Sequence, residues 1–274
     1  ANPEKFEKWG VKAKTAKELE EQGLIYIENG VLDERGRYHR FVIDKKDTVP
    51  IIKSPKEIVG YSIDRPKLLC LYTSNPGKFT QKYIEWGAGR GFNNNPTCKA
   101  RRPWYKLPEL KPAHILFPMF LRSRFVFGYA EEPIICDAAL YAVYPKCDKT
   151  IFWLYVNSTI FYLTSELYGM RMGGGALQLK VNFYEDMPVP NLAKLEISFP
   201  AEKLLKRAPL SYKDEVKQPD RRELDKAVLR ALGFPEEELD KLVDELHKAF
   251  VWVVEDRLIK AGRPLEVEED GEDN

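Results

Sequence analysis

A chain of 274 residues, of which 44% are hydrophobic and 12% aromatic, is long enough to bury a sizeable core. Its formal net charge of +1 excludes a uniformly basic nucleic-acid-binding protein, and no apolar run reaches the roughly 18 residues of a membrane span. The four cysteines include no C-x-x-C pair and only three histidines are present, so we expect neither a zinc knuckle nor a histidine-based metal site.

The charge is distributed unevenly along the sequence. The acidic stretch LEVEEDGEDN lies within an expected disordered tail at 264–274. Its negative charge offsets the positive charge of the rest of the chain, so the charge of each segment is more informative than the net charge. The first residues lack the apolar core of a secretion signal, and we therefore expect a cytoplasmic protein. The 31% of charged residues, combined with few glutamines, favours a thermophilic source.

Short helices and strands are expected in the first third of the chain. The spacing of apolar residues predicts a helix around Thr15–Gln22 that ends near Gly23 and leads into a strand. Runs of β-branched and aromatic residues predict strands at Arg40–Ile43 and Lys67–Tyr72. A further helix is expected over Lys78–Trp86.

The middle third combines strands with the longest helix that the sequence predicts. The stretch HILFPMFLRSRFVFGYAEEPIICDAALYAVYP indicates about three strands. The helix begins after Asp148, which is a good N-cap, and ends at Gly169. Its apolar residues cover more than one face, so we expect it to be buried between layers.

The composition changes after Pro190. Residues 196–218 are expected to form a polar connector, and apolar residues at helical spacing then predict two helices, with Pro235 opening the second. The sequence therefore predicts an α+β fold with mixed small β-sheets, a buried long helix and a C-terminal helical pair. The expected divisions are a first domain at 1–195, the connector at 196–218, a helical segment at 219–263 and the acidic tail at 264–274.

The segment YIEWGAGRGFNNNPTCKARRPWY, residues 83–105, has glycines at Gly87, Gly89 and Gly91 and could be a cofactor loop. Loops that bind S-adenosylmethionine or a dinucleotide need a strand, a tight glycine turn and a helix that starts at once. Here the next residues include three asparagines and two prolines, which forbid a helix of useful length. A standalone S-adenosylmethionine-dependent methyltransferase that uses GAGRG therefore stays an alternative only.

The same segment has the ingredients of a nucleic-acid surface. Glycines let the backbone approach a bulky partner, cations neutralise phosphates, and amides or aromatic rings touch bases. The cations are Arg90, Lys99, Arg101, Arg102 and Lys106. On composition alone, a solvated basic loop with Trp104 in the core explains the segment equally well. An interaction module that binds no nucleic acid is a third possibility.

The order of the motifs resembles the C-terminal target-recognition region of TaqI-like N6-adenine DNA methyltransferases of type II and type IIG restriction-modification systems. YIEWGAGRGFNNNPTCKARRPWYKLPE is similar to the family's Arg-rich stretch ending in R-x-W-Y, and KPAHILFPMF to its strand with a K-I-x-x-P pattern. VNSTIFYLTSELYGMRMGGGALQLKVNFYEDMPVP is similar to its N-S helix, glycine loop and closing L-P-x-P. This last stretch is the most specific, because its motif residues follow the family's order: Asn157, Ser158, Gly169, Arg171, Gly173, Gly174, Gly175 and Pro188–Pro190.

The resemblance implies that residues 1–195 are a DNA target-recognition domain without the catalytic half. Family members flip adenine out of the duplex and hold it with a Pro-Pro-aromatic motif, and this sequence contains no Pro-Pro pair. No catalytic, cofactor-binding or metal-binding residue is therefore expected here, and S-adenosylmethionine belongs to the missing catalytic domain. The implied partners are double-stranded DNA and a catalytic methyltransferase domain or subunit. The start at Ala1 without Met favours a fragment over a separate subunit.

The resemblance also suggests roles for single residues. The five cations named above are expected to contact phosphates. Asn93, Asn94 and Asn95 are candidates for base edges, because Asn can form two hydrogen bonds with adenine, although an Asn-rich turn explains them equally well. Trp104 and Tyr105 are candidates in the same interface, more to support the loop than to touch DNA.

Two further groups are candidates for DNA contact. Arg171 with Gly173, Gly174 and Gly175 could be an element that the DNA backbone approaches closely, although a helix cap and a flexible turn explain it slightly better. Arg122 and Arg124 would share one face of a strand, for which solvent exposure is the plain explanation. For the C-terminal helices, contact with a partner competes with packing on the same domain.

Overall fold

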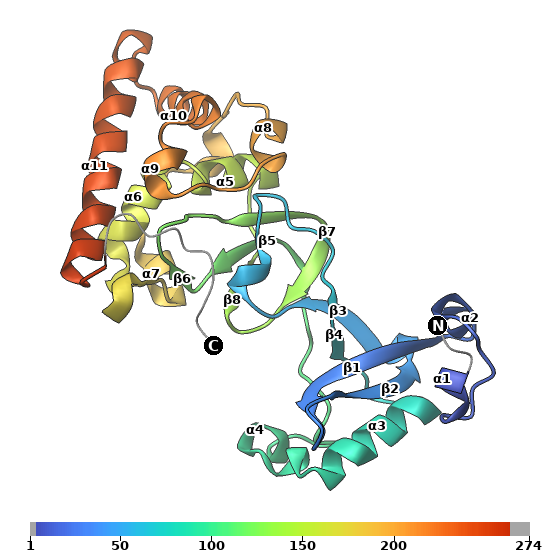
Figure 1. The fold of residues 1–274 in the computed structure, drawn as a ribbon. Helices are drawn as coiled ribbons and strands as arrows, with labels where there is room; N and C mark the ends of the chain where they lie inside the picture. Colours follow the sequence, from blue (N-terminus) through green and yellow to red (C-terminus); the bar gives the residue numbers. More distant parts are fainter. Residues whose placement is uncertain (1–3, 264–274) are drawn as a thin grey trace. The chain divides into compact units, whose positions relative to one another are not determined.

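The computed structural model describes residues 4–263, which form two compact units (Figure 1). Of the described residues, unit 1 comprises 4–51 and Pro66–Lys111, and unit 2 comprises Ile52–Arg65 and 112–263. The chain therefore passes from unit 1 into unit 2, returns to unit 1, and then completes unit 2.

These units divide the chain differently from the predicted domain boundaries. The predicted first domain, residues 1–195, includes all of unit 1 and much of unit 2. Residues 196–218 are not a polar connector, because Leu204, Tyr212 and Glu215 of this stretch are buried in unit 2. The predicted acidic tail at 264–274 lies outside the described residues.

Unit 1 contains two β-ribbons and several short helices. β1 pairs antiparallel with β2, and β3 pairs antiparallel with β4. Its elements are α1 (Glu4–Glu7), α2 (Ala16–Glu21), β1 (Leu24–Leu32), β2 (Tyr38–Asp44), η1 (Lys45–Asp47), β3 (Thr48–Ile52), β4 (Leu68–Leu71), α3 (Lys78–Gly89), η3 (Phe92–Asn94) and α4 (Pro96–Lys99). The predicted helices near 15–22 and 78–86 are confirmed, as are the strands near 40–43 and 67–72.

The core of unit 1 is small. Its buried apolar side chains come from the N-terminal segment, α2, β1 and β2: Phe6, Val11, Ala13, Leu19, Leu24 and Val42. Thr15 caps α2, since its hydroxyl oxygen accepts a hydrogen bond from the backbone N–H of Glu18. Helix α3 packs along the ribbon of β1 and β2 (Figure 1), and this packing fixes the segment that follows it.

Unit 2 holds the larger core, between a sheet and a group of helices. β5 pairs antiparallel with both β7 and β8, and a small second sheet has the order β6-β10-β9. Its elements are η2 (Pro55–Glu57), β5 (Ala113–Pro118), β6 (Phe120–Leu121), β7 (Gly128–Cys136), β8 (Leu140–Val143), α5 (Lys149–Val156), α6 (Thr159–Tyr168), β9 (Met170–Arg171), η4 (Gly173–Gly175), β10 (Leu177–Gln178), α7 (Val181–Asp186), η5 (Leu192–Lys194), α8 (Glu202–Leu205), α9 (Tyr212–Glu215), α10 (Pro219–Ala231), η6 (Glu236–Glu238) and α11 (Leu239–Lys260).

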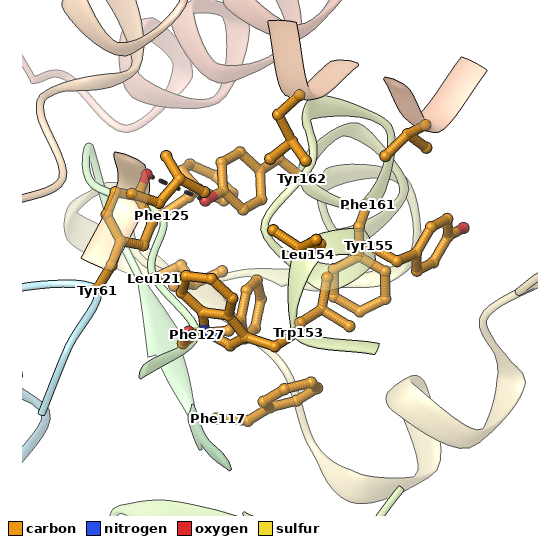
Figure 2. Close-up of a cluster of buried hydrophobic side chains, with 14 of the residues drawn as sticks. Tyr61, Phe117, Leu121, Phe125, Phe127, Trp153, Leu154, Tyr155, Phe161 and Tyr162 are labelled. Carbon is orange, nitrogen blue, oxygen red and sulfur yellow. Dashed lines mark hydrogen bonds between the residues drawn. The ribbon is translucent and has the colours of Figure 1, made fainter. Parts of the chain in front are cut away.

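Aromatic side chains fill the space between these layers. Figure 2 shows the rings of Phe117 in β5 and of Phe127, directly before β7, beside Trp153 of α5 and Phe161 of α6. On the opposite side of α6, Tyr162 packs against Phe250 of α11. Helices α5 and α6 therefore lie between the sheet and α10 and α11, which confirms the predicted buried position.

The predicted single helix from Asp148 to Gly169 is wrong in one respect, because it is broken into α5 and α6. The break lies at Asn157 and Ser158, where Ser158 takes an extended backbone conformation and its hydroxyl oxygen caps α6. Asn157 is fully buried. Its side-chain amide donates hydrogen bonds to the carbonyls of Phe127 and Trp153, at 2.9 and 3.0 Å, and its oxygen accepts one from the N–H of Phe127 at 3.1 Å.

The observed elements confirm the α+β class, with small sheets and the C-terminal pair α10 and α11. None of the helices in the described part of the chain has the length and apolar character needed to cross a membrane.

Candidate nucleic-acid interface

The N-terminus of α3 is fixed by two carboxylates from the preceding strand and turn. The Oδ2 atom of Asp44 accepts hydrogen bonds from the backbone N–H groups of Phe79 and Thr80, both at 2.9 Å. Asp47 is buried and accepts one from the N–H of Gly77 at 2.8 Å. Together these bonds anchor the start of the helix to the β-ribbon.

Gly77 is required by this anchor. A Cβ atom at this position would lie 2.3 Å from the carboxyl carbon of Asp44, whereas one at Gly89 in the last turn of α3 would meet nothing within 4 Å. We expect Gly77→Ala to lower the free energy of unfolding by about 1 to 2 kcal/mol through loss of the cap, and Gly89→Ala to raise it by about 0.5 to 1 kcal/mol. Urea unfolding followed by tryptophan fluorescence measures both, and equal effects would contradict the role of Asp44.

An aromatic cluster supports the far end of α3. Trp86 contacts Phe41 of β2, with ring centroids 4.8 Å apart, and stacks on Tyr83 at 5.8 Å. The guanidinium of Arg90 lies 5.7 Å above the Trp86 ring and is 2.7 Å from Nε2 of His39. Sequence reasoning missed His39, because it lies 51 residues before Arg90 and only the pairing of α3 with β2 brings them together.

The glycines of GAGRG do not form a cofactor loop. Gly87 and Gly89 lie inside α3, so a helix leads into the glycines instead of starting after them. Only Gly91 has the left-handed conformation, with φ of +80°, and the next helix, α4, has four residues. This arrangement does not fit the strand, turn and helix that hold S-adenosylmethionine or a dinucleotide.

The residues after α3 form a basic segment, defined here as residues 90–106. Arg90, Lys99, Arg102 and Lys106 are exposed and Arg101 is half-buried. Among the described residues, the ion pairs of unit 1 join Arg37 to Asp33, Arg40 to Glu28 and Lys45 to Glu20, and none involves the basic segment. Its positive charge is therefore not neutralised by a neighbouring carboxylate of the described chain.

The local charge confirms how uneven the distribution is. Residues 78–106 contain seven basic residues and one acidic residue, a net charge of +6 in a chain whose total is +1. A hollow of about 580 Å³ lies beside this stretch, lined by Lys46, Asp47, Tyr72–Asn75, Lys106, Leu107 and Glu109. Both surfaces belong to unit 1.

The three asparagines form the turn between α3 and α4. The N–H of Asn94 donates to the carbonyl of Gly91, and the carbonyl of Asn95 accepts from the N–H groups of Cys98 and Lys99, at 2.9 Å in each case. The side chains of Asn94 and Asn95 are exposed. Oδ1 of Asn93 is buried and has no hydrogen-bond partner among the described residues. The turn explains the backbone at these positions and leaves two amide side chains facing solvent.

Trp104 and Tyr105 pack within the basic segment. A Cβ atom at Gly87 would lie 3.3 Å from the Trp104 ring, so the glycine provides the space that this ring uses on α3. Tyr105 meets Trp104 edge to face, with ring centroids 6.0 Å apart. Trp104 thus joins the end of the basic segment to helix α3, which precedes the segment, and Tyr105 packs against Trp104.

The remaining candidate residues lie in unit 2. Arg122 and Arg124 are exposed, but they follow β6 in a bend and do not lie on a strand, so the predicted shared strand face is wrong. Arg171 lies in β9 and pairs with Asp256 of α11 at 2.7 Å. Residues 173–175 form a short 3-10 turn, in which Gly174 and Gly175 have φ of +67° and +76°.

Comparison with known proteins places this fold. Among solved structures, the type IIG restriction endonuclease BpuSI is similar over 80% of this chain and 27% of its own, with a TM-score of 0.57 and 12% sequence identity. The chain thus spans about a quarter of the length of that protein, and the likeness concerns the fold alone. A search of curated proteins found no match.

The family model gives a more specific result. The model described as "Type II methyltransferase M.Eco57I, C-terminal domain" matches residues 63–222, which is more than half of the chain. This match agrees with the motif resemblance at the level of a C-terminal part of a restriction-modification methyltransferase. The chain belongs to the family of the C-terminal domain of the type II methyltransferase M.Eco57I.

Proposed function

We propose that this chain is the sequence-specific DNA-binding, or target-recognition, part of an N6-adenine DNA methyltransferase or restriction-modification enzyme. The observation that carries the proposal is the basic segment, whose exposed cations have no ion-pair partner among the described residues. By contrast, all arginines of α10 and α11 pair with carboxylates: Arg221, Arg222, Arg230 and Arg257. The contrast favours a surface kept free for an anionic partner over a solvated structural face.

The chemistry of the basic segment fits the backbone of duplex DNA. Arg90, Lys99, Arg101, Arg102 and Lys106 would neutralise phosphates and fix the register of the protein on the duplex. The exposed amides of Asn94 and Asn95 would then reach base edges in the major groove. Trp104 and Tyr105 would support the segment, and Asn93, whose side-chain oxygen is buried, stays a candidate for a base contact only.

The finer assignments rest on the resemblance. We propose that the parent enzyme is TaqI-like, methylates adenine at N6 and works in the cytoplasm, and that its source is thermophilic. S-adenosylmethionine and the Pro-Pro-aromatic motif would belong to a catalytic domain or subunit outside this chain. The helical geometry around Gly87 and Gly89 argues against the alternative of a standalone methyltransferase built on GAGRG.

Fluorescence anisotropy of the chain with a random-sequence duplex across a salt series tests the proposal. The five cations of the basic segment should contribute about −4 to −5 to the slope of the logarithm of the binding constant against the logarithm of the salt concentration. In a variant with alanine at four positions, the magnitude of the slope should shrink by about 3 to 4, and the binding should weaken at each salt concentration. The four positions are Lys99, Arg101, Arg102 and Lys106.

A matched control removes the same charge from other exposed sites of unit 1. Its alanines replace Lys12, Lys14, Lys17 and Arg35. This control should keep a slope near that of the unchanged chain. Equal losses in both variants would indicate a general charge effect, and absence of binding at low salt would reject the DNA-binding proposal for the isolated chain in favour of an interaction module.

A further inference from the structure

The small sheet of unit 2 brings two distant candidate segments together. Leu177 of β10 pairs with Leu121 of β6 on one side and with Arg171 of β9 on the other. Two strand spacings separate the outer strands, which places the residue after Leu121 about 10 Å from Arg171. Arg171 lies on one outer strand of this sheet and Arg122 follows the other, so the two residues, 49 positions apart in the sequence, lie at the same end of the sheet, which we call its edge.

A buried arginine joins the loops at this edge. Arg257 of α11 is 2% exposed, and its guanidinium donates to both carboxylate oxygens of Glu166 at 2.8 to 3.0 Å. The same guanidinium donates to the carbonyl of Arg122 at 2.8 Å and to the carbonyl of Gly175. The side chain of Arg257 thus binds the backbone of the loop after β6 and of the glycine turn, and Glu166 neutralises its charge.

The glycine turn is also fitted closely to the end of α11. A Cβ atom at Gly175 would lie 2.9 Å from the side chain of Leu258, so a larger residue would push the turn away from the helix. The Nε atom of Arg263 donates to the carbonyl of Gly174 at 3.1 Å, and Arg263 is exposed. The turn is therefore held by the helix end and is not a free flexible loop.

Arg171 and Arg263 flank this turn, together with one acidic group. Asp256 accepts hydrogen bonds from Arg171 at 2.7 Å and from Lys260 at 2.9 Å. Glu166 also contacts this edge, but it is buried and bound to Arg257. Among residues 4–263, arginines therefore outnumber the accessible carboxylates that bind to this edge.

We propose that Arg122, Arg124, Arg171 and Arg263 form a second phosphate-binding surface, the arginine edge, and that buried Arg257 is its positioning residue. Arg263 is a new member of the DNA interface, and Arg257 acts through the loops without touching DNA. The inference rests on the proposed DNA-binding function and extends it from unit 1 to unit 2.

The chemistry of guanidinium explains why this position needs arginine. Its planar fork carries five N–H donors, enough to bind a carboxylate and two backbone carbonyls at once. Lysine has a single flexible ammonium and cannot hold three acceptors in this fixed geometry. Methionine would fill a similar volume without any donor, so both loops would lose their shared anchor.

The first experiment compares two double variants of the full chain. Arg257→Met with Glu166→Gln removes the positioning pair without leaving a buried charge. Arg221→Met with Glu215→Gln removes the charges of a second buried arginine–glutamate pair of unit 2, whose side chains hydrogen-bond to residues outside 122–124 and 171–175 in the described chain, and serves as the control. Amide hydrogen exchange is measured for residues 122–124 and 171–175, and DNA affinity is measured across a salt series.

We expect faster exchange at both loops, weaker DNA binding and a salt slope smaller by about 2 in the Arg257 variant only. A surface variant with alanine at Arg122, Arg171 and Arg263 should reduce the magnitude of the slope by about 3. Amide exchange next to the two carbonyls that Arg257 binds should stay unchanged in this variant. If neither the Arg257 variant nor the surface variant changes the slope of a chain that binds DNA, the arginine edge is rejected while the proposed function stands. If the unchanged chain binds no DNA, both proposals fail together.

Discussion

Replacing Arg221 by methionine is expected to lower the free energy of unfolding by about 3 to 5 kcal/mol, because it breaks a buried ion pair and leaves Arg207 as the remaining charged partner of Glu215. Arg221 has no exposed surface and donates to Oε1 of Glu215 through Nε and Nη2, at 3.0 and 2.8 Å. It also donates to the hydroxyl of Tyr61 and to the carbonyl of Asn157. The side chain thereby joins segment 52–65, helix α9 and the break between α5 and α6.

Urea unfolding at neutral pH measures this loss. The control is Tyr61→Phe, which removes one hydroxyl from the same network and should cost about 1 kcal/mol. The double variant Arg221→Met with Glu215→Gln should lose less than Arg221→Met alone, since no buried charge stays unpaired. A single variant whose stability falls by less than about 1 kcal/mol would show that Arg207 alone neutralises Glu215.

The same network predicts a pH dependence. Burial alone would raise the pKa of Glu215, but hydrogen bonds from Arg207 and the charge of Arg221 outweigh it and lower this pKa to about 2 from an ordinary 4.5. A carboxyl with a depressed folded-state pKa contributes stability above its unfolded value and loses it as the pH falls toward the folded value. Stability should therefore fall between about pH 4.5 and pH 2, by up to about 3 kcal/mol, and less steeply in Arg221→Met.

Capping residues and the spacing of apolar residues predicted many helices and strands, because both depend on neighbouring positions in the sequence. Asp148 caps α5 as predicted, and the helix predicted around Thr15–Gln22 is α2, which Thr15 caps. The break at Asn157 was missed, since the apolar pattern continues through it and its stabilising contacts include residues distant in the sequence, such as Phe127, 30 residues earlier. The buried position of Glu215 was hidden for the same reason, because its partners Arg207 and Arg221 neutralise it within a polar stretch.

The division into units depends on contacts that the sequence does not reveal. Residues 52–65 join unit 2 through Ile63, whose N–H donates to the carbonyl of Tyr129 at 2.7 Å. Nothing in the composition of this stretch separates it from the strands of unit 1 on either side. The predicted boundaries therefore followed composition, whereas the units follow pairing between strands far apart in the chain.

The two groups of candidate interface residues also differ in whether the sequence alone reveals them. The basic segment could be recognised from charge, glycines and aromatic residues within 17 consecutive positions, 90–106. The edge at Arg122 and Arg171 could be named only as two separate candidates, because β10 and Arg257 bring them together. The DNA contacts of both groups stay predictions, and the two salt-series experiments separate them.

The motif residue Asn157 has a structural role that makes a strong prediction. Asn157→Ala is expected to lower the free energy of unfolding by about 2 to 3 kcal/mol, because the buried N–H of Phe127 loses its acceptor and Tyr162 loses a partner at 3.1 Å. The carbonyl of Phe127 still accepts a hydrogen bond from the indole N–H of Trp153 at 2.7 Å, and this bond limits the loss of stability.

The matched control is Asn191→Ala, at an exposed asparagine that starts a short helix without a side-chain capping bond. It should change stability by less than about 0.5 kcal/mol. Urea unfolding of both variants, followed by tryptophan fluorescence because Trp153 lies beside the break, distinguishes them. A small effect at Asn157 would mean that the helix break persists without this side chain.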